Sequence, residues 1–295
     1  MVPNRSAGDD AALEAILRAG SRTFYFASHA LPRRMRAPTL ALYAFCRAAD
    51  DAVDDASSAE HSRRAVDRLR ARIERVYSGH ALDDLVERSF GRVVEEYALP
   101  RVELDLLAEG MAWDAAGRRY ATLPDLREYA LRVAGTVGVL MTHLMGPTAP
   151  PVLERARDLG IGMQLTNIAR DVGADARIGR LYLPLDWLAE VGVDPDAFLR
   201  GPTPFGAIRA TVARLLRAAD EHYARADEGI GHLPRDCRVA VRAARLIYAD
   251  IGRVIRRRDY DSVSTRAVVS GRRKAWLLAR SVGALSWQPE PLGAA

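Results

Sequence analysis

Residues 43–55 read YAFCRAADDAVDD, and the spacing of their polar side chains decides how the rest of the chain is interpreted. Asp50 and Asp54 are four residues apart, so a helix places both carboxylates on one face. Tyr43 and Arg47 continue the same stripe upstream. Two carboxylates on one face repel each other unless a cation neutralises them, and a plain acidic turn at a helix C-terminus would oppose the helix dipole. The stretch therefore predicts a helix with a metal-binding face.

A second polar stripe follows in residues 164–175, which read QLTNIARDVGAD. Asn167, Asp171 and Asp175 recur every four residues, and Gln164 lies one turn before them. At about 1.5 Å of rise per residue, the stripe is roughly 12 Å long. Alone it is a polar helix end. Together with the first stripe it predicts a second metal-binding face.

An arginine accompanies each stripe. Arg47 precedes the first carboxylates and Arg170 lies beside Asp171. Mg²⁺ binds few carboxylates and completes its shell with water and substrate phosphates, while arginine binds phosphate oxygens in pairs. Two such faces across a cavity therefore predict a site where a diphosphate is bound and leaves.

The rest of the chain repeats the helical spacing of apolar residues. The expected helices cover residues 9–17, 39–55, 63–77, 82–97, 102–113, 125–145, 152–171, 186–191, 205–226, 237–257 and about 272–286. Pro38 is placed at the start of the second helix, and Gly173 in a loop after residues 152–171. No segment alternates as a strand does. We expect one all-α domain over residues 1–295, with a core at about 12–285 and frayed termini.

Composition narrows the class of protein. The 295 residues are 49% hydrophobic and 27% charged, which excludes a disordered or purely coiled-coil chain. Two cysteines without metal spacing indicate a reducing compartment. The N-terminus lacks a signal-peptide core, and the apolar stretch at 133–145 is too short to span a bilayer. We expect a cytoplasmic protein.

The charge balance is mildly basic, with 43 Lys and Arg against 38 Asp and Glu. Basic residues gather between Arg253 and Lys274, which is either a solvated face or one that contacts an anionic membrane surface. Because no nucleic-acid module or aromatic-basic interleaving is present, nucleic acid is not an expected partner. Peripheral contact with the inner membrane is compatible with this run.

Five ordered blocks resemble the squalene/phytoene synthase family. They are SRTFY at 21–25, the first aspartate stretch within 41–54, VAGTVG at 133–138, the second aspartate stretch within 162–171, and YLP at 182–184. The resemblance covers about residues 20–280. The sequences of residues 169–173 and 179–185 are most similar to those of bacterial phytoene synthases. It implies the isoprenoid synthase helical fold with a central cavity.

The resemblance also implies residue roles. Mg²⁺ or Mn²⁺ would be held by Asp50, Asp54, Asn167, Asp171 and Asp175. Diphosphate groups would be held by Arg22, Thr23, Tyr43, Arg47, Gln164, Arg170, Tyr248 and Arg266. Tyr129 would lie near the reacting carbons and join the four aspartates as a catalytic residue, although on sequence alone Tyr129 and Tyr248 are typical core residues. Gly20 and Leu131 depart from some relatives, which carry His and an aromatic residue there.

The implied activity is head-to-head condensation of two geranylgeranyl diphosphates through prephytoene diphosphate to 15-cis-phytoene, the first committed step of carotenoid biosynthesis. No dinucleotide fingerprint is present, so NADPH is not expected. A squalene or dehydrosqualene synthase acting on farnesyl diphosphate is an alternative. A class I terpene cyclase or head-to-tail elongase is more distant, because residues 50–54 also read as DDxxD. A non-enzymatic helical assembly factor is the last alternative.

Overall fold

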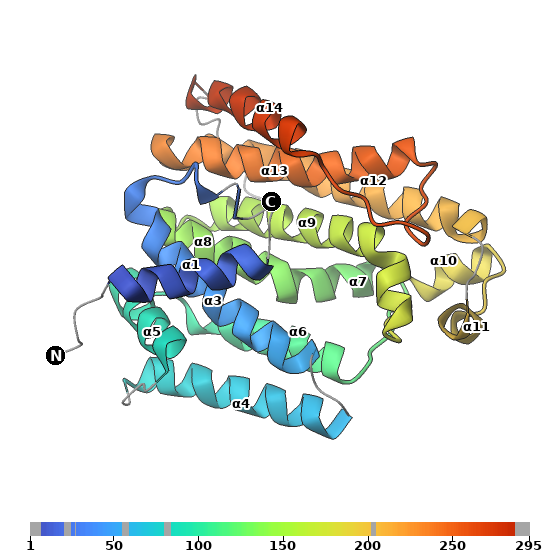
Figure 1. Ribbon diagram of the computed structural model, residues 1–295, viewed down its shortest axis with the longest axis horizontal. Helices are drawn as coiled ribbons and strands as arrows, with labels where there is room; N and C mark the ends of the chain where they lie inside the picture. The colour runs from blue at the N-terminus through green and yellow to red at the C-terminus, as the bar shows by residue number, and fades with distance from the viewer. Residues whose placement is uncertain are drawn as a thin grey trace.

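The computed structural model describes residues 7–20, 25–26, 28–54, 59–79, 84–201 and 205–286, and over these ranges every regular element is a helix (Figure 1). The predicted all-α class is confirmed. The helices are α1 Ala7–Gly20, α3 Arg33–Asp54, α4 Ala59–Ser78, α5 Leu85–Tyr97, α6 Arg101–Ala115, α7 Leu123–Ala130, α8 Thr136–Met145, α9 Pro150–Arg177, α10 Leu185–Glu190, α11 Pro195–Arg200, α12 Phe205–Ile230, α13 Arg235–Arg257 and α14 Gly271–Ser281. A π-helical segment, η1, spans Leu131–Gly135, and a 3-10 segment, η2, spans Val282–Ser286.

Helix α9 lies at the centre of the molecule. It packs along α12 and also contacts α8, α13 and η1. Figure 1 shows α4 at one edge of the molecule and α14 at the opposite edge. The 28 residues of α9 therefore form the axis on which the second polar stripe is displayed.

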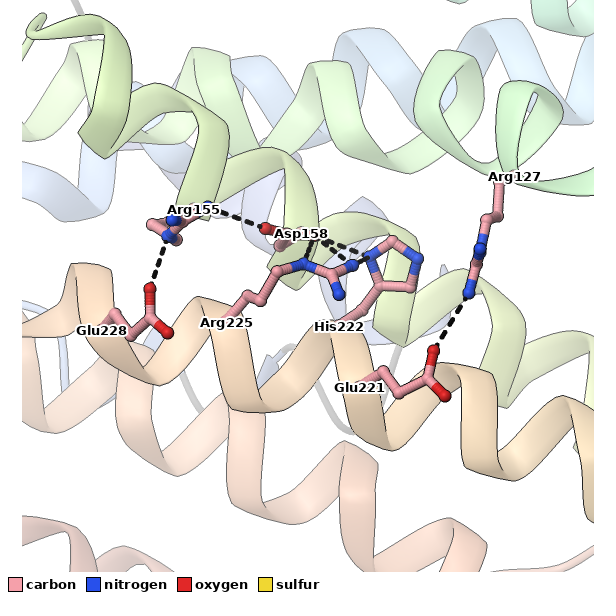
Figure 2. A network of polar contacts seen from close by, with 7 residues as sticks. All are labelled: Arg127, Arg155, Asp158, Glu221, His222, Arg225 and Glu228. Atoms are coloured by element: carbon pink, nitrogen blue, oxygen red, sulfur yellow. Dashed lines mark hydrogen bonds and ion pairs between the residues drawn. The ribbon is translucent and has the colours of Figure 1, made fainter. Parts of the chain in front are cut away.

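Buried polar contacts fix α9 against α12 (Figure 2). Asp158 of α9 has Oδ1 2.7 Å from His222 Nδ1 and 2.9 Å from Arg225 Nε of α12. Burial raises the pKa of Asp158, but the hydrogen bonds from His222 and Arg225 outweigh it and hold that pKa below its usual range. One turn earlier, Arg155 donates from Nε to Glu228 over 2.9 Å. These contacts set the position of α9 along α12.

The path into α8 differs from the single helix expected at 125–145. A capping box starts α7, in which Thr122 Oγ1 accepts from the Asp125 amide and Asp125 accepts from the Thr122 amide. After α7 the helix continues as the π-helical segment η1, where the Thr136 amide donates to the Leu131 carbonyl five residues back. A Cβ on Gly160 of α9 would collide with the Ala134 carbonyl oxygen, so glycine is required for this close approach. This close packing of η1 on α9 coincides with the break between α7 and α8. The spacing of apolar residues along the sequence does not reveal such a backbone contact.

Pro38 and Gly173 were also placed wrongly at helix ends, and α11 was not predicted. Helix α3 begins at Arg33 and contains Pro38, because Met35 is fully buried and Arg34 pairs with Asp236 at 2.8 Å. Helix α9 continues past Gly173, whose amide donates to the Ser262 carbonyl over 3.0 Å. A Cβ on Gly173 would collide with the Val263 backbone, so this glycine marks a close crossing rather than a loop.

Candidate active site

One cavity of about 900 Å³ is lined by α3, α8, α9, α13 and the segment at 266–269. Along α9 its wall changes character. Val152, Ala156, Leu159 and Met163, with Arg155 as the one charged residue among them, are followed by Gln164, Asn167, Asp171 and Asp175. The cavity thus has a polar end on the later turns of α9 and an apolar body on the earlier ones, which confirms the expected central cavity.

The first stripe lines the polar end from α3. Tyr43, Arg47 and Asp50 all face the cavity. Arg47 lies 3.3 Å from Asp50 Oδ2 and donates from Nε to Asp51 Oδ2 over 3.0 Å. Burial raises the pKa of Tyr43 to about 12, so its hydroxyl stays protonated and remains a donor. Asp54 is the last residue of α3, and its side chain is outside the described part of the structure. Arg22 and Thr23 also lie outside the described residues.

The second stripe faces it from α9. Asp171 accepts from Arg170 Nε at 2.9 Å and from Arg266 Nε at 2.7 Å. Burial raises the pKa of Asp171, but these two guanidinium groups hold it below the usual range. Burial, helped by the nearby Asp171, raises the pKa of Asp175 to about 7. The two carboxylates are therefore close enough to disfavour each other's charge.

These groups fit a divalent cation only with help from other ligands. Among the described residues, no three His, Cys, Asp or Glu side chains converge as a metal cluster. The Asn167 Oδ1 is buried without a hydrogen-bond partner in the described structure, and Asp175 lacks sufficient counter-charge. Such oxygens suit a cation that keeps water and substrate phosphate in its shell.

A group of aromatic residues borders the same cavity. The Tyr129 hydroxyl donates to Asp114 Oδ2 over 2.7 Å, and the Tyr182 hydroxyl donates to Asp114 Oδ1 over 2.8 Å. Burial raises the pKa of Tyr129 well above its ordinary value. Asp114 was not predicted as a site residue, because a single acidic residue in the last turn of a helix has no periodic partner. Arg180 and Lys274 also line the cavity and were not predicted as site residues, because neither belongs to a polar stripe with helical spacing.

Every predicted site residue whose side chain is described lines this one cavity. The set is Tyr43, Arg47, Asp50, Tyr129, Gln164, Asn167, Arg170, Asp171, Asp175, Tyr248 and Arg266. Of the two positions that depart from relatives, Gly20 lines the cavity, where a Cβ would collide with the Tyr43 hydroxyl. Leu131 lies in η1 and packs partly buried against the core formed by α9, α12 and α13.

Comparison with known proteins agrees with this geometry. The family described as squalene/phytoene synthase matches residues 17–273. The phytoene synthase of Rhodobacter capsulatus is 48% identical over 266 residues, which cover 90% of this chain and 78% of that protein. The phytoene synthase of Cereibacter sphaeroides is 51% identical over 280 residues, covering 92% and 79%.

Solved structures share the fold. A dehydrosqualene synthase in complex with ligand superposes with a TM-score of 0.86 at 30% identity, covering 94% of this chain and 96% of that one. A squalene synthase from Alicyclobacillus acidocaldarius superposes with a TM-score of 0.76 at 24% identity, covering 86% and 95%, and it bears on the fold alone.

Proposed function

The chain belongs to the squalene/phytoene synthase family and is a prenyltransferase, and from this we propose that it joins two geranylgeranyl diphosphates head to head to form 15-cis-phytoene, acting as one domain. The observation that carries the proposal is the change along α9 from an apolar cavity wall to a carboxylate stripe flanked by arginines. A prenyl diphosphate has the same two parts. The alternative, condensation of farnesyl diphosphate, uses the same geometry with shorter chains.

The arginines would bind the diphosphate by exchanging partners. Arg47, Arg170 and Arg266 each pair with a carboxylate of the two stripes. A diphosphate offers them bidentate, charge-assisted bonds, and their departure frees the carboxylates for a cation. We assign diphosphate contacts to Arg22, Thr23, Tyr43, Arg47, Gln164, Arg170, Tyr248 and Arg266; for Arg22 and Thr23 the assignment rests on the family resemblance.

Prenyl-diphosphate enzymes of this family depend on a divalent metal, and we propose Mg²⁺ as the ion. The residues that would hold it are Asp50, Asp54, Asn167, Asp171 and Asp175. When bound, the ion neutralises charge on the departing diphosphate. The unpartnered Asn167 oxygen and the closely spaced Asp171 and Asp175 support this assignment.

The apolar body would hold the isoprenoid chains. Met141, Met145, Leu159 and Met163 line it with flexible apolar side chains. Such walls exclude water from the allylic cation, which water would otherwise capture as an alcohol. Tyr129, which is buried, lines the cavity and hydrogen-bonds to Asp114, is proposed to lie beside the reacting carbons.

The decisive experiment is incubation with geranylgeranyl diphosphate and Mg²⁺, followed by analysis of the hydrocarbons. We expect 15-cis-phytoene and released diphosphate. Product from farnesyl diphosphate alone would move the assignment to a squalene or dehydrosqualene synthase, and a cyclic product from one substrate to a terpene cyclase. Asp50→Ala and Asp171→Ala, each checked for folding, should abolish turnover, which a non-enzymatic factor would not show.

We also propose a cytoplasmic enzyme that contacts the membrane surface through α14 and η2. No described helix is long and apolar enough to cross a bilayer. Trp276, Val282 and Leu285 are nevertheless exposed, by 49%, 51% and 43%. Residues 250–280 carry nine basic and three acidic side chains, and one of the acidic ones, Asp250, pairs with Arg253 and Arg273. An exposed tryptophan among basic residues is typical of a face that lies on anionic lipid headgroups.

This face borders the cavity. Val268, 68% exposed, and Lys274, in the first turn of α14, both line it. Within the described structure, Arg272 and Arg280 have no carboxylate within ion-pair distance, and Arg280 instead lies 5.6 Å from the Trp276 ring centroid. These charges remain available to lipid phosphates. A lipophilic product would then leave close to the bilayer.

A further inference from the structure

We propose that Asp114 is a positioning residue that turns the hydroxyl protons of Tyr129 and Tyr182 toward itself, so that both phenol oxygens present lone pairs to the carbocations formed in the cavity. The proposal rests on the proposed function. It adds a residue that no sequence motif marked. No proton is transferred in this role, because Asp114 acts only through the orientation of the two hydroxyl groups.

The geometry brings three separate segments to one carboxylate. Asp114 lies in the last turn of α6, Tyr129 in the last turn of α7, and Tyr182 in the segment after α9. Each tyrosine hydroxyl reaches a different oxygen of the carboxylate, at 2.7 Å and 2.8 Å. All three side chains line the cavity. One carboxylate thus sets both hydroxyl groups at once.

The direction of the protons follows from the available donors. A phenol has one hydroxyl proton, and an ionised carboxylate only accepts hydrogen bonds. Both protons therefore point to Asp114, and the 3.5 Å contact between the two hydroxyl oxygens is the longer of the contacts that Tyr129 makes. Burial keeps the pKa of Tyr129 high, so the group is a neutral dipole and not a phenolate. The negative end of each dipole is left for the cavity.

The rings are fixed by packing. The Tyr129 and Tyr182 rings stack with centroids 5.2 Å apart and an interplanar angle of 23°. Tyr120, fully buried, has its ring centroid 5.2 Å from that of Tyr129. Preorganised dipoles and ring faces stabilise positive charge without reorganising during the reaction. This wall therefore suits the allylic and cyclopropyl-bearing cations of the proposed reaction.

The position of Asp114 has a cost that a surface acid would not bear. A carboxylate in the last turn of a helix faces the negative end of the helix dipole. Asp105, earlier on the same helix, is 55% exposed and pairs with Arg101 at 3.4 Å. The two aspartates share a helix but differ in environment, so Asp105 supplies a matched control.

The test compares Asp114→Asn with Asp105→Asn in the full chain, using geranylgeranyl diphosphate and Mg²⁺. An asparagine of the same shape replaces one acceptor oxygen with an NH₂ donor, so only one tyrosine can keep its bond. We expect KM to stay within about twofold and kcat to fall about tenfold or more. The share of substrate recovered as the cyclopropyl diphosphate intermediate or as alcohols should rise. Asp105→Asn should keep the wild-type product ratio.

Tyr182→Phe provides a second variant that does not depend on the folding of Asp114→Asn. It should shift the product ratio in the same direction. Adding Asp114→Asn to Tyr182→Phe should lower kcat by a smaller factor than Asp114→Asn does in the wild-type chain. A wild-type product ratio in folded Asp114→Asn, or full additivity, would overturn the proposal. If the wild-type chain makes no C40 hydrocarbon, the proposed function fails instead, and the same product-ratio test is run with farnesyl diphosphate.

Discussion

Arg266 donates from Nε to Oδ1 of Asp171 over 2.7 Å, although the two residues are 95 positions apart in the chain. The Asp171 side chain is 16% exposed, whereas that of Arg266 is 61% exposed. The segment after α13 therefore places a largely exposed cation against a largely buried carboxylate at the polar end of the cavity. An arginine in this position can leave the carboxylate for a phosphate at little cost.

Replacing Arg266 with glutamine tests this exchange. Because Arg266 is largely exposed and the buried Asp171 keeps its bond to Arg170, Arg266→Gln should lower the free energy of unfolding by only about 1 kcal/mol. Glutamine cannot make a charge-assisted bidentate bond to phosphate, so KM for the prenyl diphosphate should rise about tenfold or more. Steady-state kinetics and urea denaturation measure the two effects.

Arg209→Gln is the matched control. Arg209 on α12 also pairs with an aspartate, Asp259, and is 51% exposed, but it does not line the cavity. Its replacement should leave KM unchanged. Equal changes in KM for both variants would contradict a diphosphate contact by Arg266.

The pKa of Asp175 predicts an unusual dependence of stability on pH. Burial and the charge of Asp171 raise this pKa from 3.8 to about 7 in the folded chain. Between about pH 4 and pH 7 the folded protein holds a proton that the unfolded chain has lost, so stability falls as the pH rises. Asp175→Asn removes this loss, and at pH 8 the metal-free variant should be about 1–2 kcal/mol more stable than the wild type.

Asp171→Asn should act with the opposite sign. The pKa of Asp171 is lowered in the folded chain, so its charge stabilises the fold above its unfolded pKa and that contribution is lost in acid. At pH 8 in EDTA, urea denaturation should give a lower free energy of unfolding for Asp171→Asn than for the wild type. For Asp175→Asn it should give a higher one. Changes of the same sign would contradict the opposite pKa shifts of the two carboxylates.

The regular spacing of polar and apolar residues predicted the helix faces correctly. Asp50 on α3 and Asp171 on α9 were predicted to lie on helix faces because residues four apart share a face whatever the tertiary structure. The structure places both on one cavity. Each helix pattern was local, and the all-α class followed from the sum of these patterns.

What the sequence did not predict depends on contacts between distant segments. Gly173 was interpreted as the start of a loop, whereas it is the point where residues 262–263 cross α9. Asp114 is a single acidic residue whose role exists only once Tyr129 and Tyr182 arrive beside it. Neither relationship has a period along the chain.

The crossing of η1 on α9 yields a packing prediction. A Cβ on Gly160 would collide with the Ala134 backbone, which cannot rotate away as a side chain does. Gly160→Ala should therefore lower the free energy of unfolding by about 1–3 kcal/mol and reduce activity, because η1 begins two residues after Tyr129. Gly206→Ala on α12, where nothing lies within 4 Å of the new Cβ, should be neutral or slightly stabilising. Equal losses at both positions would contradict the backbone contact.

The membrane-facing role of α14 is tested by vesicle sedimentation. The Trp276 ring centroid lies 4.3 Å from Cζ of Arg273 and 5.6 Å from Cζ of Arg280. The ring and the neighbouring guanidinium groups therefore form one amphipathic surface. Trp276→Ser should reduce binding to vesicles containing phosphatidylglycerol about fivefold, with little change in turnover of detergent-dispersed substrate. Val102→Ser removes a comparably exposed apolar side chain, 57% exposed, from α6, which Figure 1 shows apart from α14, and should bind as the wild type does. Because the surface is basic, binding should be weak to pure phosphatidylcholine and should decrease with salt. Equal binding of the wild type to neutral and anionic vesicles, or an equal loss with Val102→Ser, would show that α14 is not the contact surface.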